Sequence, residues 1–83
     1  MPMDKKITLI SGPNCHLCEQ AKEILQPLLN AKNIQLDTLS VRDDAGLFER
    51  YGLRIPVLIF EDGSEKGWPF TAAQIARIID KNI

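Results

Sequence analysis

The sequence predicts a single α/β domain over residues 1–83, in which three helices flank a four-stranded mixed sheet in the order βαβαββα. Short apolar and β-branched runs alternate with segments of helical periodicity, and this alternation sets the order of elements. The strand–helix–strand start implies a right-handed crossover and therefore a parallel strand pair. Asp62-Gly63 is a strong two-residue hairpin turn and adds an antiparallel edge. Eighty-three residues are too few for two hydrophobic cores.

The first strand is expected at Ile7–Ile10, where the residues are β-branched or apolar, and Ser11–Pro13 ends it. Asn14 is a good N-cap residue and would place Cys15 at the first helical position. Pro27 removes a backbone hydrogen bond within the helical pattern, so we expect a kink or an early end there. The apolar residues at helical spacing are Leu17, Ala21, Ile24, Leu25, Leu28 and Leu29.

The second strand is expected at Ile34–Val41, although the alternation there is imperfect. Asp43 or Asp44 can then cap a short helix that continues through Tyr51. Gly52 follows as an expected left-handed helix terminator.

A nearly all-apolar run, Pro56–Phe60, predicts a central strand that is buried on both faces. The hairpin turn leads from it into a brief strand, Ser64 to about Trp68. Thr71–Gln74 has the pattern of a capping box, and Phe70 with Ile75 would form its hydrophobic staple. The last helix is expected to bury one stripe, made of Ala72, Ile75, Ala76, Ile79 and Ile83.

Composition excludes several classes of protein. The chain is 45% hydrophobic and 25% charged, which is typical of a globular domain, and its net charge of −1 gives no strong attraction to nucleic acid or anionic lipid. Its longest apolar runs, such as Ile55–Phe60, are too short to span a bilayer. Met1–Lys6 is followed by no small-residue cleavage site, so we expect no signal peptide and a cytoplasmic location. We also expect the chain to be a monomer.

The two cysteines of the chain, Cys15 and Cys18, stand two residues apart at the expected start of a helix. A disulfide between them would close a loop of about four residues and contribute roughly 2 kcal/mol, which makes it a weak structural staple. The spacing suits redox chemistry better, because one thiol can attack and its neighbour can resolve the product. The alternative is that both are small buried hydrophobic residues.

Two segments carry a resemblance to a known family. The Gly12–Cys18 segment follows the first strand and Arg54–Val57 precedes the third, and together they resemble the glutaredoxin branch of the thioredoxin superfamily. The chain is most similar to small bacterial glutaredoxin-like proteins with a Cys-His-Leu-Cys centre, a Tyr51–Val57 segment and a Trp68–Phe70 segment. The resemblance covers nearly the whole chain and implies a thioredoxin-like fold.

The same resemblance implies thiol–disulfide exchange on protein or glutathione disulfides, with no tightly bound cofactor and with glutathione as a possible co-substrate. The chain departs from well-studied glutaredoxins at three places. His16-Leu17 replaces a Pro-Tyr pair, Lys66–Thr71 replaces a Gly-Gly stretch that holds glutathione, and no basic residue precedes the motif.

Cys15 is the expected nucleophile, because unpaired amides and the positive end of the helix dipole favour its thiolate. Cys18, one turn further in, is the expected resolving thiol. A cationic imidazole at His16 would stabilise that thiolate; alternatively, His16 is an exposed side chain of little effect.

The remaining expected substrate-binding residues lie in the second segment. By resemblance, Ile55 would pair its backbone with the substrate chain, next to a cis bond at Pro56, whereas an ordinary trans proline starting a strand is the alternative. Arg54 would place a positive charge near Cys15 or meet a substrate carboxylate, unless it is simply a solvated arginine. Trp68 and Phe70 are interpreted as packing residues, with an apolar wall beside the site as the alternative.

No metal site is expected within one chain, because Cys15, His16 and Cys18 supply three ligands and a closed structural zinc site needs four. An iron–sulfur cluster shared between two chains stays open. Two further functions therefore remain beside the oxidoreductase. One is a non-catalytic binding module that carries such a cluster or presents the Ile55–Pro56 edge to a partner, and the other is a degenerate domain without turnover.

Overall fold

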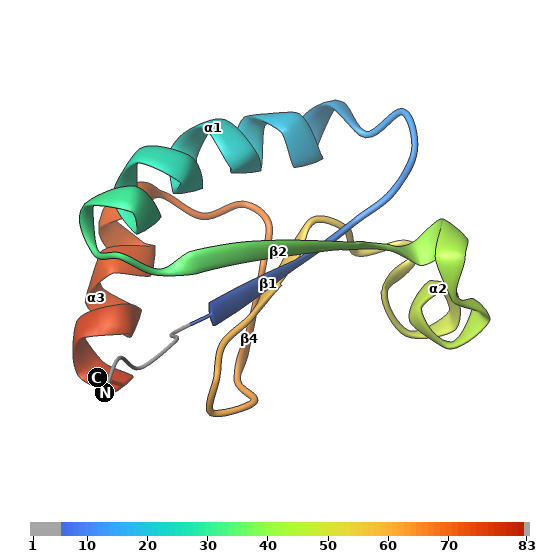
Figure 1. Cartoon of the computed structure of the whole chain (residues 1–83). Helices are drawn as coiled ribbons and strands as arrows, with labels where there is room; N and C mark the ends of the chain where they lie inside the picture. The colour runs from blue at the N-terminus through green and yellow to red at the C-terminus, as the bar shows by residue number, and fades with distance from the viewer. Residues whose placement is uncertain (1–5, 83) are drawn as a thin grey trace.

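A computed structural model describes residues 6–82 and has the predicted βαβαββα order, with one additional 3-10 turn (Figure 1). The four strands form one mixed sheet, and the three helices cover its faces, so the expected α/β class is confirmed. The elements are β1 (Lys6–Ser11), α1 (His16–Ala31), β2 (Gln35–Ser40), the 3-10 turn η1 (Val41–Asp43), α2 (Ala45–Tyr51), β3 (Val57–Ile59), β4 (Glu65–Gly67) and α3 (Ala72–Asn82).

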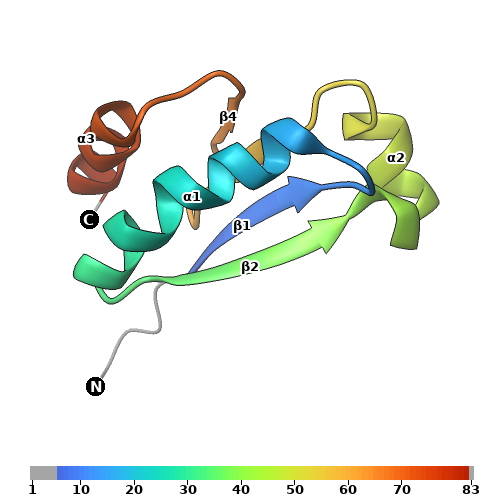
Figure 2. The ribbon, with the colours of Figure 1, turned by 90° about the horizontal axis from the view of Figure 1, so that it is seen from above.

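The sheet has the strand order β2-β1-β3-β4. β1 and β2 are parallel, while β1 with β3 and β3 with β4 are antiparallel. Figure 2 shows α1 running along β1 and β2, with α3 beside it and α2 near the ends of these two strands. The carboxyl ends of β1 and β2 therefore lie close to the start of α1 and to α2.

Side-chain alternation along β1 divides the core into two clusters. Ile7 and Leu9 join α1 and α3 in the larger cluster, whereas Ile10 joins a smaller one under α2. The larger cluster consists of Ile7, Leu9, Ala21, Leu25, Leu29, Ile34, Leu58, Phe60, Phe70, Ile75 and Ile79. The smaller cluster consists of Ile10, Val41, Tyr51 and Val57. Each face of the sheet is thus held by its own set of helices.

The start of α1 differs from the prediction by one residue. Asn14 has a φ of 54° and is not the N-cap; Cys15 takes that position, and the helix begins at His16. Asparagine is one of the few residues that adopt the left-handed region at low cost. The chain therefore turns at Asn14, and this turn brings the Cys15 side chain itself to the helix N-terminus.

The expected early end of α1 at Pro27 is wrong, since the helix continues to Ala31. Pro27 and Glu23, whose carbonyl loses its intrahelical partner, both lie on the exposed side of the helix. Leu25 and Leu29, on either side, are buried in the larger cluster and hold the helix on the sheet. Packing thus overrides the local cost of the proline.

Gly52 is not the left-handed terminator that the sequence indicates, because its φ of −52° and ψ of −33° are right-handed helical values. A Cβ at this position would lie 2.5 Å from the Phe48 carbonyl oxygen and 3.0 Å from the Phe48 ring. Glycine is therefore required at position 52 because a side chain there would clash with Phe48. Asp44, one of the two expected caps, accepts hydrogen bonds from the amides of Gly46 and Leu47.

The hairpin between β3 and β4 has three loop residues and not the expected two. Ile59 pairs with Glu65, the amide of Phe60 donates to the Ser64 carbonyl, and the Gly63 amide donates to the Phe60 carbonyl. Gly63 has a φ of 91° and is the last residue of the loop, the position at which a three-residue hairpin needs the left-handed conformation that glycine adopts easily. The turn chemistry was recognised correctly, and the loop length was not.

The capping box of α3 is confirmed. The Thr71 amide donates to Gln74 Oε1, and the Gln74 amide donates to Thr71 Oγ1. Phe70 and Ile75 are buried in one cluster, as expected for the staple, but Ala72 is exposed and does not belong to the buried stripe. Ile83 lies outside the described residues. Across residues 6–82, no helix has the length and apolar character needed to cross a bilayer.

Candidate redox site

Cys15 and Cys18 form a disulfide across the first turn of α1, with their Cα atoms 5.2 Å apart. Cys15 is partly exposed, and Cys18 is fully buried. The Cys15 sulfur also accepts a hydrogen bond from the Cys18 amide at 3.1 Å. The two sulfurs are therefore unequal, because only Cys15 faces both solvent and an amide of the helix N-terminus.

A surface hollow of about 400 Å³ lies over Cys15, and we call it the Cys15 hollow. Gly12, Asn14, Cys15, His16 and Glu19 line it. His16, at the first helical position, is exposed and stands beside the sulfur in this lining. A reacting molecule can therefore approach Cys15 from solvent. A role for His16 in binding substrate or stabilising the thiolate stays a prediction.

The loop before β3 packs against the loop that leads into α1. A Cβ at Gly12 would lie only 2.8 Å from Ile55 Cδ1, so the absence of a side chain at Gly12 permits this approach. The Ile55–Pro56 peptide bond is cis, and Pro56 is buried. The Pro56 carbonyl accepts from the Trp68 amide at 3.1 Å. Gly12 was not a candidate residue, and its place just before the cysteine motif was the available signal.

Arg54 contacts a carboxylate that the sequence did not connect with it. Its guanidinium lies 3.9 Å from Glu65 on β4 and 5.7 Å from the centre of the Tyr51 ring. The buried Tyr51 hydroxyl donates to the same carboxylate at 2.6 Å. This hydrogen bond, together with burial and the nearby negative charge, raises the pKa of Tyr51. A role for Arg54 in binding substrate stays a prediction.

Trp68 and Phe70 pack as the sequence indicates. Phe70 is buried in the larger cluster and Trp68 packs against that cluster. Their rings meet edge to face with centroids 5.0 Å apart. Among residues 6–82, no three His, Cys, Asp or Glu side chains come together in a way that could hold a metal ion.

Several solved structures are similar to this chain as a whole. A protein from X. campestris, XcR50, has an X-ray structure that matches with a TM-score of 0.79 and 37% sequence identity, covering 90% of this chain and 96% of that one. Protein Ne2328 from Nitrosomonas europaea matches with a TM-score of 0.77 and 21% identity, covering 94% of both chains. Thioredoxin 1 from Thermosipho africanus, at 13% identity and 93% and 92% coverage, has a TM-score of 0.72, which shows the thioredoxin-like fold. The profile of the glutaredoxin-like domain (DUF836) matches residues 6–80, and this chain therefore belongs to that family of the thioredoxin superfamily.

Proposed function

We propose that this chain is a thiol–disulfide oxidoreductase in which Cys15 is the nucleophile and Cys18 the resolving thiol. The observation that carries the proposal is the inequality of the two sulfurs: Cys15 is partly exposed at a helix N-terminus, and Cys18 is buried within bonding distance. A thiolate at Cys15 would keep the Cys18 amide as a hydrogen-bond donor and would feel the positive end of the α1 dipole.

In the reducing direction, the Cys15 thiolate attacks one sulfur of a substrate disulfide. The substrate S–S bond breaks, the other substrate sulfur leaves as a thiolate and takes up a proton, and a mixed disulfide forms on Cys15. Cys18 then loses its proton and attacks the Cys15 sulfur, which releases the second substrate thiol. Two electrons have moved from the dithiol to the substrate, and the chain is left with the Cys15–Cys18 disulfide.

Ile55 and Pro56 are proposed to receive the substrate backbone, since they pack against the loop before Cys15. Either a protein disulfide or glutathione can serve as partner in this scheme, and we propose that the chain works as a monomer without a tightly bound cofactor. A cytoplasmic location also belongs to the proposal, because thiols are kept reduced in that compartment.

The test uses the two single-cysteine variants, which are matched controls for each other. Cys15→Ser should reduce disulfide reduction to background, because no nucleophile remains. Cys18→Ser should still attack and should accumulate a mixed disulfide, seen as added mass on Cys15 by intact-mass spectrometry. Full activity in Cys15→Ser would refute the assignment of the nucleophile.

If the reduced wild-type chain turns over no disulfide, the proposal of an enzyme is wrong. The non-catalytic alternatives then stand, and absorbance of anaerobically purified protein would separate a cluster-bridged dimer from a module that presents the Ile55–Pro56 edge.

A further inference from the structure

Four large apolar side chains of the described residues are exposed. Among the described residues, the most exposed are Leu53 at 100%, Phe48 at 58%, Leu39 at 47% and Leu17 at 42%. Leu17 stands between the two cysteines, and Leu53 stands two residues before Ile55. Single exposed apolar side chains are common, so a contact surface near Cys15 requires an apolar hollow as well.

A second hollow, of about 430 Å³, lies beside the Cys15 hollow, and we call it the Pro13 hollow. Its lining is mostly apolar and consists of Pro13, Val41, Arg42, Ala45 and Phe48. Pro13 is flanked in sequence by Gly12 and Asn14, which both line the Cys15 hollow. Consecutive residues of one loop therefore line the two hollows. A polypeptide bound through its sulfur to Cys15 can place a neighbouring side chain in the Pro13 hollow.

The charges around these hollows favour a polypeptide over glutathione. Glutathione carries two carboxylates and one ammonium group, yet the lining of the Cys15 hollow has no lysine or arginine for the carboxylates. The Glu19 carboxylate in that lining is already paired with Lys22 at 3.7 Å. Arg54, the cation in the neighbouring loop, already lies 3.9 Å from Glu65. Arg42 lines the Pro13 hollow.

We propose that the substrate is a polypeptide whose reacting cysteine is flanked by an apolar side chain, and that this side chain docks in the Pro13 hollow. Arg42, at the same hollow, would meet a backbone carbonyl or an acidic side chain of the substrate. The proposal rests on the proposed redox function and deepens it, because it selects a polypeptide sulfur over glutathione as the partner of Cys15.

The probe is a set of short peptides that carry one cysteine as a mixed disulfide with 2-nitro-5-thiobenzoate. Phenylalanine occupies in turn each of the three positions on either side of the cysteine, and serine replaces it in the matched peptides. The pre-reduced chain attacks the peptide sulfur, the disulfide to thiobenzoate breaks, and the coloured thiolate leaves because it is the more acidic thiol. Cys18 then releases the peptide thiol, so no added reductant is needed.

For the wild-type chain we expect the phenylalanine peptide to react about tenfold faster than its serine partner at one or more positions, because an aromatic side chain leaves water. Phe48→Ala should bring that ratio close to one, and Ala45→Phe should do the same by filling the hollow. Leu39→Ala is the control, since Leu39 is similarly exposed but lines neither hollow, and it should keep the wild-type ratio.

The 2-hydroxyethyl disulfide of the same thiobenzoate separates the two proposals. If the wild-type chain reacts with it but shows no preference above about twofold at any position, the docking proposal is wrong and the redox function stands. A preference that survives both Phe48→Ala and Ala45→Phe also overturns it. If the chain reacts with neither probe, both proposals fail.

Discussion

Two polar clusters occupy opposite edges of the same sheet face, and they differ in how their carboxylates are paired. The strand register places Asp37 on β2 and Glu65 on β4 in one row across the sheet, with Thr8 and Ile59 between them. Each carboxylate has cationic and neutral partners. We call the two sets the Glu65 cluster and the Asp37 cluster.

The Glu65 cluster joins α2 to β4 beside the Ile55–Pro56 loop. The Tyr51 hydroxyl donates to Glu65 at 2.6 Å, and Arg50 and Arg54 approach the carboxylate at 4.0 and 3.9 Å. The Arg54 amide also donates to the Tyr51 carbonyl at 2.7 Å, which closes the turn after α2. Both guanidinium groups lie within 6 Å of the ring centre of Tyr51, so the cluster includes cation–π contacts.

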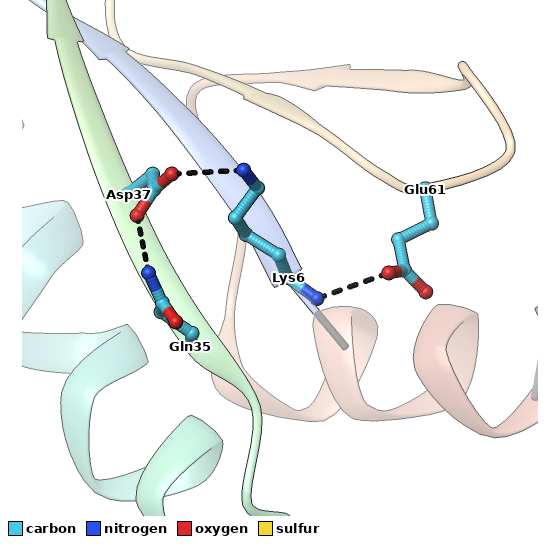
Figure 3. Close-up of polar contacts among 4 residues, drawn as sticks. All are labelled: Lys6, Gln35, Asp37 and Glu61. Carbon is cyan, nitrogen blue, oxygen red and sulfur yellow. Dashed lines mark hydrogen bonds and ion pairs between the residues drawn. The ribbon is translucent and has the colours of Figure 1, made fainter. Parts of the chain in front are cut away.

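The Asp37 cluster ties the start of β1 to its neighbours (Figure 3). The ammonium of Lys6 lies 3.2 Å from Asp37, and Gln35 Nε2 donates to the same carboxylate at 2.8 Å. The Lys6 backbone amide donates to the Glu61 carboxylate at 3.2 Å. The hydrogen bond from Gln35, followed by the hydrogen bond and charge of Lys6, lowers the pKa of Asp37.

The two carboxylate side chains are similarly exposed, 28% for Glu65 and 36% for Asp37. Their main partners differ strongly in exposure. Tyr51 is 3% exposed, whereas the Lys6 side chain is 51% exposed. An exposed pair loses side-chain entropy and is screened by water, so it contributes little. A buried hydroxyl that loses its acceptor cannot turn to water. The burial of the partner therefore decides the value of each cluster.

The largest effect on stability is expected from the Glu65 cluster. Tyr51→Phe removes the hydroxyl donor while the ring stays in the smaller core cluster, and it should lower the free energy of unfolding by about 1–2 kcal/mol. Urea denaturation of the reduced chain measures this change.

Glu65→Ala is the matched variant because it removes the acceptor, and a double-mutant cycle with Tyr51→Phe isolates the energy of the pair. A coupling energy indistinguishable from zero would show that the hydroxyl gains nothing from Glu65.

A smaller effect is expected at high pH. The folded state raises the pKa of Tyr51 above its ordinary value near 10, so between the two values the unfolded chain releases a proton that the folded chain keeps. The stabilisation is present below pH 10 and is lost as pH rises through the folded pKa. The wild type should therefore lose stability above about pH 10 more steeply than Tyr51→Phe.

Tyr51 is the one tyrosine of the chain, so tyrosinate absorbance follows its titration directly. Parallel stability curves for the wild type and Tyr51→Phe above pH 10, or a tyrosinate transition at the ordinary value, would contradict this expectation.

The sequence predicted the order of elements because local signals and packing agree there. The Thr71–Gln74 capping box and the buried strand at Val57–Ile59 are examples. The predictions of an early helix end at Pro27 and of a left-handed Gly52 were wrong, because tertiary contacts decide there. Buried leucines hold α1 on the sheet past the proline, and the Phe48 carbonyl leaves no room for a side chain at Gly52. Periodicity along one segment does not carry such information.

The same limit applies to the site. The sequence shows Cys15 and Cys18 two residues apart at an expected helix start, which favours redox chemistry, and in the structure they form a disulfide across the first turn of α1. Arg54 was interpreted only as a solvated side chain or a contact for the active site or its substrate. Its contact with Glu65 links positions eleven residues apart, and only the three-dimensional arrangement of β4 and the turn after α2 reveals it.

The smallest effect is expected from the Asp37 cluster. Asp37→Asn keeps the size of the side chain and an acceptor for Gln35 but removes the charge that faces Lys6, so it should reduce stability by less than Tyr51→Phe.

Because the fold lowers the pKa of Asp37, the stabilisation is present above the ordinary value of about 3.9 and is lost as pH falls through the folded pKa. The difference in urea midpoint between the wild type and Asp37→Asn should thus be small at neutral pH, disappear in strong acid, and shrink in about 1 M salt, where charges are screened within about 3 Å. A loss as large as that of Tyr51→Phe, unchanged by salt, would mean that burial of the partner does not separate the two clusters.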